Sequence, residues 1–282
     1  MKERTFEEGS WIQLKDRALF RLSGPDRVRY LNGQVSNDVS GPVNRRSIAA
    51  CLCSLKGKVE ALVWISGLED VLWIDGQLDQ RDEIFARLDR YLIADDCELE
   101  DVTGDYSLVH HFCSGGAGVR SARCRQEGHD IFLPAGAEIP YDEEKQITGE
   151  EFLEVQLLSG IPMAPNEISG DLFPAELGLD RWAVDFHKGC YLGQEVVSRI
   201  ESVGRVKRFF GLSIAGGPVR EGESLRREDE ITGKATRAAT ALEKEIYIVP
   251  GLFGGKVEGS QLARSHAVEP LDPRRGAILE RD

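Results

Sequence analysis

The sequence predicts an α+β protein whose C-terminal part consists of strands. Up to residue 204, short strand-like and helix-like stretches alternate without a fixed repeat, a pattern typical of α+β domains rather than of solenoids. From residue 205 to residue 282, short strand-like stretches are separated by glycine-rich turns. A chain of 282 residues is long enough for about two domains with ample core. We therefore predict domains at 1–204 and 205–282, the second being a small β-barrel or sandwich.

The first elements follow the pattern of a mixed sheet. Pro25 suits the first turn of a helix that carries Val28, Leu31 and Val35 toward the core. A second helix is expected at 80–92, with apolar residues four apart on one side and charges on the other. Strands are expected at 18–23, 47–55, 59–66, 71–75, 99–102 and 107–112. The order strand, strand, helix, strand is compatible with a ferredoxin-like sheet.

The later elements lead through a loop to the C-terminal strands. Helices are expected at 150–159 and 194–200, and the loop 160–171 between them carries two prolines. Further strands are expected at 208–214, 234–242, 245–249 and 261–267. We expect the tail from 270 to 282 to lie on the surface or to fray.

Composition limits the classes of partner. A net charge of -13 argues against a nucleic-acid or anionic-membrane surface, because such binding depends on clustered Lys and Arg. The basic residues Arg199, Arg205, Lys207 and Arg208 are interpreted as a solvated edge. No apolar run approaches the ~20 residues of a membrane span. The N-terminal residues resemble neither a transit peptide nor a secretory signal, so we expect a cytoplasmic protein.

Five of the six cysteines offer no evident chemistry. The cysteines at 51, 53, 97, 113, 124 and 190 lack the paired spacing of disulfide scaffolds or zinc sites, and we expect reduced thiols. Cys51 and Cys53 would share one face of a strand. Because a complete ligand set is missing, we interpret them as small core residues. His110 and His111 would point to opposite faces of a strand, so no metal site is predicted.

Cys190 has a more unusual setting. It follows Lys188 by two residues, lies between Gly189 and Gly193, and precedes a predicted helix. The glycines allow a sharp turn and close approach of another molecule. The charge of Lys188 and the positive end of the helix both favour a thiolate, which makes Cys190 the residue most expected to react. We expect it to be solvent-accessible, on a loop that leads into the helix. The alternative is a tight turn whose cysteine is simply small, and spacing alone does not decide between the two.

Three motifs carry a family resemblance. Residues 188–195 match K-G-C-Y-x-G-Q-E. Residues 22–26 and 30–39 resemble L-x-G-x-D and F-L-x-G-x-x-[ST]-N-D, and residues 160–162 and 173–176 resemble G-I-P and L-P-x-E, with Tyr30 and Phe173 as the departures. In these motifs the chain resembles the YgfZ family, folate-binding relatives of the glycine-cleavage aminomethyltransferase (T-protein) that are associated with iron–sulfur proteins. The resemblance implies two ferredoxin-like lobes and a C-terminal β-barrel around a central cavity. It also implies tetrahydrofolate, or a one-carbon derivative, as cofactor, and a role in assembly or repair of four-iron four-sulfur clusters in client enzymes.

The resemblance also assigns roles to single residues. The glutamate of the L-P-x-E element holds the pterin in T-proteins, and Glu176 matches it; on the residues alone, Glu176 reads as a carboxylate in the first turn of a helix. A carboxylate suits the pterin's N–H groups as a bidentate partner. Asn37 and Asp38 are expected to build the turn that positions the cofactor, and Gln194 joins them as a cofactor-binding residue. Cys190 and Lys188 are the candidate catalytic pair.

One departure from the T-protein pattern concerns catalysis. In aminomethyltransferases a K-G-G-x-x-D-D segment carries the catalytic aspartate, whereas this chain has Ala61 and Leu62 at the aspartate positions. Glu60 lies one place early, and on a strand a shift of one residue reverses the face. Glycine cleavage is therefore not expected. Two alternatives to the YgfZ-type role remain: a folate-dependent methyl or aminomethyl transferase or demethylase that uses Cys190, and an adaptor that keeps the fold without folate.

Overall fold

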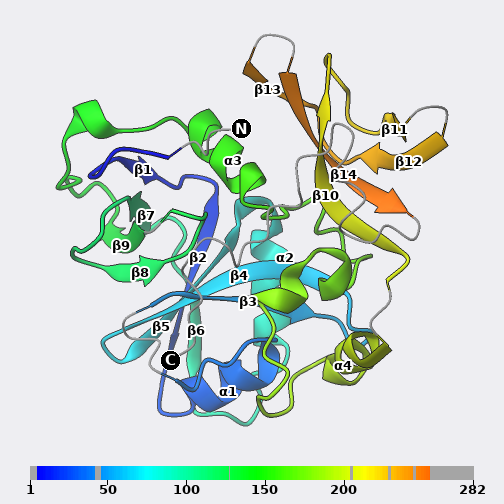
Figure 1. Ribbon diagram of the computed structural model, residues 1–282. Coiled ribbons are helices and arrows are strands. Elements are labelled where there is room, and N and C mark those ends of the chain that lie inside the picture. The colour runs from blue at the N-terminus through cyan, green and yellow to red at the C-terminus, as the bar shows by residue number, and fades with distance from the viewer. Residues whose placement is uncertain are drawn as a thin grey trace.

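The computed structural model describes residues 5–41, 46–126, 128–203, 206–227, 230–243 and 246–254. The strand predicted at 261–267 and the tail at 270–282 lie outside this part. The described chain forms three antiparallel sheets, seen as separate units in Figure 1. Its α-helices are α1 (Arg27–Gln34), α2 (Arg81–Asp89), α3 (Gly149–Leu158) and α4 (Gln194–Val203). Within the described ranges, none of the helices has the length and apolar character needed to cross a membrane.

The central sheet has five strands, all antiparallel to their neighbours. Their order is β3 (Ile48–Cys53), β4 (Val59–Leu68), β5 (Val71–Gln77), β2 (Arg17–Ser23) and β6 (Glu98–Asp101). Helix α1 connects β2 to β3, and α2 follows β5 before β6. The order β4-β5-β2-β6 with these two helices is the split β-α-β arrangement of a ferredoxin-like sheet, extended by β3 at one edge.

Both faces of the central sheet are buried. Successive side chains of a strand point to opposite faces. On β4, Ala61, Val63 and Ile65 accordingly pack in a core with the apolar residues of α1 and α2. Leu62 and Trp64 pack in a second core on the opposite face. Cys51 and Cys53 lie fully buried in this second core, which confirms that they are core residues on one face of β3.

A second sheet of four strands was mostly missed by the sequence pattern. Its order is β1 (Trp11–Gln13), β7 (Tyr106–His111), β9 (Gly128–Pro134) and β8 (Val119–Ser121), and only β7 was predicted. Buried polar residues such as His129 and Asp130 interrupt the apolar pattern of β9. Helix α3, which begins with a capping box between Thr148 and Glu151, packs on this sheet through Phe152. With one described helix, this unit departs from the two-helix ferredoxin-like pattern.

The C-terminal sheet is open among its described strands. Its path is β10 (Arg208–Ala215), β14 (Ile246–Gly254), β12 (Glu230–Ala235) and β11 (Ser224–Arg227), with β13 (Thr240–Glu243) also paired to β14. The prediction of one strand at 234–242 was wrong, because the chain turns between β12 and β13. No closed barrel is seen in this part, so the barrel stays a prediction for 205–282.

The C-terminal sheet is tied to the loop after α3 by an arginine. Arg237 donates to Glu167 at 3.1 and 2.5 Å, and the Glu167 side chain is fully buried. Glu167 also accepts a hydrogen bond from the backbone N–H of Met163 at 2.9 Å. This ion pair fixes the proline-containing loop against the C-terminal sheet.

Candidate functional site

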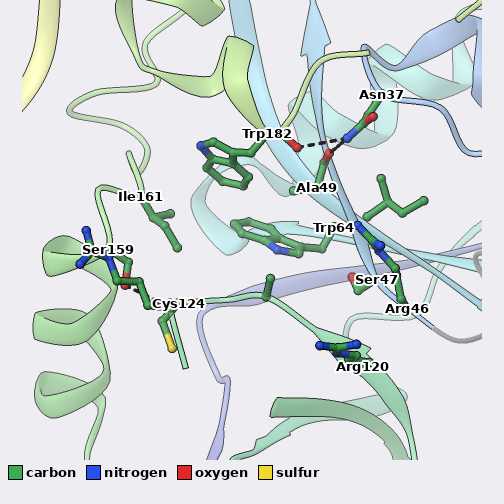
Figure 2. A pocket seen from close by; sticks show the side chains of 13 residues that line it. Asn37, Arg46, Ser47, Ala49, Trp64, Arg120, Cys124, Ser159, Ile161 and Trp182 are labelled. Atoms are coloured by element: carbon green, nitrogen blue, oxygen red, sulfur yellow. Dashed lines mark hydrogen bonds between the residues drawn. The ribbon is translucent and has the colours of Figure 1, made fainter. Parts of the chain in front are cut away.

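A pocket opens between the central sheet and the four-stranded sheet (Figure 2). It is partly open to solvent. Its walls come from the turn after α1, from β3, β4 and β8, and from the segments around 124, 160 and 182. The lining residues are Asn37, Arg46, Ser47, Ile48, Ala49, Trp64, Arg120, Ala122, Cys124, Arg125, Ser159, Ile161 and Trp182. Among the residues that the structure describes, the lining includes three arginines and no carboxylate, and none of it belongs to the described part of the C-terminal sheet.

Two tryptophans form the aromatic walls. The ring centroids of Trp64 and Trp182 lie 6.5 Å apart at 45°, and Figure 2 shows the rings one above the other. Both indole N–H groups and the Ser47 hydroxyl are buried and lack a hydrogen-bond partner among the described residues. Because buried polar groups normally have partners, these three atoms suit acceptors on a bound molecule. An aromatic pocket with a few polar groups is typical of a small-molecule site.

The turn after α1 forms one side of the pocket. The Asn37 side-chain amide donates to the carbonyls of Ala49 at 2.8 Å and Trp182 at 3.2 Å, while its oxygen accepts from the Asp38 N–H at 3.0 Å. The Asp38 carboxylate accepts two hydrogen bonds from Ser40, which lower the pKa of Asp38. Both side chains thus build the turn, as predicted. Asn37 lines the pocket and Asp38 does not.

Lys188 clamps the end of α1. Its ammonium donates to the carbonyls of Asn32, Val35 and Asn37 at 2.7, 2.8 and 2.8 Å, which uses all three of its N–H donors. A cation at these carbonyls also complements the negative end of the helix dipole. Burial lowers the pKa of Lys188 to about 8, although Asp38 and Asp185 oppose the shift. The expected pairing of this charge with the Cys190 thiol is thus replaced by a structural contact with the turn that bears Asn37.

Cys190 lies on an exposed loop before α4, as predicted, and of the six cysteines, all within the described ranges, only Cys190 is exposed. Gly193 has φ of +86°, and a Cβ there would lie 2.4 Å from the Ser54 carbonyl oxygen. A Cβ at Gly189 would meet nothing within 4 Å. A side chain therefore has room at position 189 but not at position 193. Gln194 begins α4 half-buried and does not line the pocket.

The structure does not bring Glu176 to the pocket. Its side chain is buried in a 3-10 turn, Pro174–Glu176. One oxygen accepts from the Phe173 N–H at 3.0 Å, and the other accepts from Arg208 at 3.2 Å. Lys58 lies 4.0 Å away. Both carboxylate oxygens are thus engaged in holding this turn against the first strand of the C-terminal sheet.

The position of the T-protein catalytic aspartate carries no acid here. Glu60 forms an ion pair with Arg87 of α2 at 3.3 Å, on the face of the sheet away from Trp64. A register shift between β3 and β4 leaves Glu60 without a strand partner, as in a β-bulge. Ala61 and Leu62 are both buried in apolar cores.

Sequence reasoning missed the residues that give the pocket its character. Trp64, Trp182, Arg46 and Arg120 lie in four separate stretches of the chain. Trp64 reads as an ordinary core residue of a strand. The one available signal was the tryptophans themselves. The chain has only four in 282 residues, and large aromatic side chains are common in ligand sites.

Comparisons with known proteins agree with the motifs. No family model matches the sequence. The chain is 25% identical to the iron-sulfur cluster assembly factor IBA57 homolog, mitochondrial, of Dictyostelium discoideum, over 78% of this chain and 65% of that protein, just under two thirds of its length. It is 27% identical to the tRNA-modifying protein YgfZ of Serratia proteamaculans, over 84% of this chain and 82% of that protein. It is 26% identical to the tRNA-modifying protein YgfZ of Klebsiella pneumoniae, over 92% of this chain and 91% of that protein.

A solved structure shares the fold. Glycine cleavage system aminomethyltransferase T from Bartonella henselae matches with a TM-score of 0.75 and 17% sequence identity, over 90% of this chain and 81% of that chain. The described sheets and their helices therefore have the aminomethyltransferase T arrangement. Together with the sequence relatives, this fold confirms the resemblance of the chain to the YgfZ family and to the related glycine-cleavage T-protein.

Proposed function

We propose that this protein binds tetrahydrofolate and supports assembly or repair of four-iron four-sulfur clusters in client enzymes. Two kinds of relative support the proposal: one is named an iron-sulfur cluster assembly factor and others are named tRNA-modifying protein YgfZ. The exposed Cys190 thiol supplies a soft sulfur ligand or nucleophile at the surface, where a client or its cluster has access.

The observation that carries the proposal is that one turn joins the pocket to the thiol loop. The Asn37 side chain lines the pocket, and the Asn37 carbonyl accepts from Lys188, two residues before Cys190. Two further backbone bonds attach the same loop: the Asp185 N–H donates to Ser36 at 2.9 Å and the Leu192 N–H donates to Gly33 at 3.3 Å. A ligand that orders the turn also orders the loop that presents Cys190.

The pocket residues fit a folate. Trp64 and Trp182 offer aromatic faces to a flat pterin ring, and their unpartnered N–H groups suit its ring acceptors. The arginines at the pocket suit the anionic glutamate tail. Bound tetrahydrofolate supplies a carrier for one-carbon units. In this arrangement Asn37 contacts the cofactor, while Glu176 holds a neighbouring turn.

The transferase alternative lacks comparable support. Aminomethyl transfer in the related enzymes uses a carboxylate beside the folate, and none of the described residues that line this pocket carries one. Glu60 is the acid next to positions 61 and 62, where the T-protein pattern has its aspartates, and its side chain is paired with Arg87.

Calorimetric titration of tetrahydrofolate tests the cofactor part of the proposal. The wild-type protein should bind, and Trp182→Leu should bind about 3- to 10-fold more weakly, because an aromatic contact adds ~0.5–1.5 kcal/mol. Trp11→Leu, which removes a tryptophan on the four-stranded sheet outside the pocket, serves as the control. Absence of binding by the wild type would refute a folate-binding role.

Complementation tests the cluster part. In cells that lack this protein, the activity of a four-iron four-sulfur dehydratase should be restored by the wild type and not by Cys190→Ser. Cys97→Ser, which changes a half-buried thiol, is the matched control and should restore activity. Equal restoration by both variants would remove Cys190 from the function.

A further inference from the structure

One face of the four-stranded sheet carries a cluster of reactive side chains outside the pocket. His111 of β7 and His129 of β9 are cross-strand partners. Cys113 follows His111 by two residues, and its sulfur lies 3.4 Å from Nδ1 of His129. The ring of Tyr141 stacks on that of His111, with the ring centroids 3.9 Å apart. Figure 1 shows this sheet on the side of the molecule away from α4, and so away from the loop that bears Cys190.

The contact between thiol and imidazole makes Cys113 chemically different from Cys97 and Cys124. An imidazole nitrogen beside a thiol accepts its proton, and the imidazolium then stabilises the thiolate. Burial instead raises the pKa of Cys97 and raises the pKa of Cys124 to about 12, which favours inert thiols. Burial, and then the charge of a Cys113 thiolate, raise the pKa of Tyr141. The phenol is therefore within electrostatic range of the same sulfur.

A glycine-rich loop, residues 114–118, leaves this sulfur a narrow opening to solvent. Cys113 is 6% exposed and His129 is 8% exposed, whereas every residue of the loop is exposed. A Cβ at Gly116 would lie 3.1 Å from the Cys113 sulfur, so the bare backbone at this position keeps the space beside the sulfur open. A Cβ at Gly115 would meet nothing within 4 Å. Such an opening suits a small uncharged reagent rather than a protein partner.

We propose that Cys113 and His129 form a site of oxidative modification that reacts with hydrogen peroxide. The His129 imidazole takes the thiol proton, and the thiolate sulfur attacks one oxygen of the peroxide. An S–O bond forms and the O–O bond breaks. The second oxygen leaves as hydroxide, which takes the proton from the imidazolium and becomes water. The sulfur is thereby oxidised by two electrons to a sulfenic acid, and the peroxide is reduced. The site is separate from the proposed folate binding and from Cys190.

Trapping of the sulfenic acid with dimedone, followed by peptide mass spectrometry, tests the site in the full-length protein. The reduced protein is treated with hydrogen peroxide, and the adduct is quantified at each cysteine. Cys113 should be labelled at least about 10-fold faster than Cys97 and Cys124, because the thiolate is the nucleophile. His129→Gln should slow the labelling of Cys113 at least about 10-fold, since it removes the general base. His111→Gln, which removes the neighbouring imidazole and leaves His129 in place, should keep most of the rate.

Two glycine variants test the access of the oxidant and stay informative if His129→Gln does not fold. Gly116→Ala places a methyl group against the sulfur and should slow the labelling of Cys113, whereas Gly115→Ala places one in open space and should not. Thermal unfolding checks that each variant is folded. Labelling of Cys113 only after denaturation would overturn the proposal, and so would equal rates in the wild type and a folded His129→Gln variant. Equal rates in the two glycine variants would overturn it as well, because the oxidant would then not reach the sulfur past this loop.

Discussion

Lys188 shows how a motif residue can act through position rather than reactivity. The motif placed it beside Cys190, where a positive charge favours a thiolate. In the folded chain its ammonium reaches three backbone carbonyls at the end of α1, more than 150 residues earlier in the sequence. Lys188 therefore fixes the distance between the thiol loop and the pocket turn.

Replacement of Lys188 by methionine tests this clamp. Lys188→Met keeps the length of the side chain and leaves three carbonyls without their donor, so the free energy of unfolding should fall by about 1.5–3 kcal/mol, the range for hydrogen bonds to charged groups. Urea denaturation measures the change. Lys56→Met, at an exposed turn position, should change stability by less than ~0.5 kcal/mol. Equal effects of the two substitutions would argue against the clamp.

Glu176 has two possible roles, holding its own turn or contacting the pterin, and a measurement of stability distinguishes them. In the structure its carboxylate is the partner of Arg208 and of the Phe173 N–H. Glu176→Gln should therefore lower the free energy of unfolding by about 1–3 kcal/mol and change tetrahydrofolate affinity little. Denaturation and calorimetry on the same samples give both quantities. A variant of unchanged stability and clearly weaker folate binding would instead support the pterin contact that the family resemblance implies.

At the scale of elements, α4 and the loop of Cys190 rest on the β3–β4 turn. A Cβ at Gly57 in this turn would lie 3.0 Å from Val196 of α4, and a Cβ at Gly193 would lie 2.4 Å from Ser54. Both glycines have positive φ, at +72° and +86°. The absence of side chains here lets the helix and the turn approach closely.

The two glycines that flank Cys190 offer a matched pair of substitutions. Gly193→Ala should lower the free energy of unfolding by about 1–3 kcal/mol, because alanine is strained at positive φ and its Cβ meets the Ser54 carbonyl. Gly189→Ala has open space around it and should change stability by less than ~0.5 kcal/mol. Thermal unfolding of the two variants provides the comparison, and a similar loss in both would contradict the packing described here.

At the scale of the whole molecule, a buried chain of charges joins the central sheet to the four-stranded sheet. Arg123 donates to Asp75 of β5 at 2.9 and 2.7 Å and to Asp130 of β9 at 2.9 Å. Asp130 also bonds to His110 of β7 at 2.8 Å. Arg17 completes the network through Asp75 at 2.7 Å. The guanidinium groups of Arg17 and Arg123 lie over the Trp64 ring, 4.8 and 5.3 Å from its centroid, so the network also supports the pocket wall.

This network predicts how stability depends on acid. Burial alone would raise the pKa of Asp130, but Arg123 and His110 hold that pKa well below its usual range. The unfolded chain then binds a proton at Asp130 below about pH 3.9, where the folded chain does not. The contribution of Asp130 to the free energy of unfolding is therefore complete above that pH. It falls by about 1.4 kcal/mol per pH unit as the pH decreases below it.

Acid titration of two variants checks the assignment. Asp130→Asn removes the titrating group. Below about pH 3.9 the free energy of unfolding of this variant should therefore fall less steeply with decreasing pH than that of the wild type. The difference in slope should be the contribution of one proton, about 1.4 kcal/mol per pH unit. Asp105→Asn, at an exposed position, should retain the wild-type slope. An unchanged slope in Asp130→Asn would show that the acid sensitivity arises elsewhere.

Local patterns were sufficient for the α+β class, for α1 to α4 and for most strands of the central sheet. A helix repeats its apolar residues within a few positions, and a strand that is buried on both faces is a short continuous apolar run. The motif around Cys190 likewise indicated an exposed loop before a helix, which the structure confirms. The same patterns failed for β9, whose buried Asp130 is paired with residues from other strands. They also failed for 234–242, where the chain turns between β12 and β13.

The pocket depended on the tertiary structure alone. Asn37, Trp64, Arg120 and Trp182 lie on separate elements, and no periodicity in the sequence relates them. The partners of Lys188 and Glu176 were also decided by the fold, since a charged side chain is satisfied by whichever carbonyl or counter-ion lies within about 3 Å of it after folding. The sequence by itself determined which residues were able to form elements and which thiol would be exposed. Which charges met, and which aromatic rings faced each other, followed from how the sheets packed.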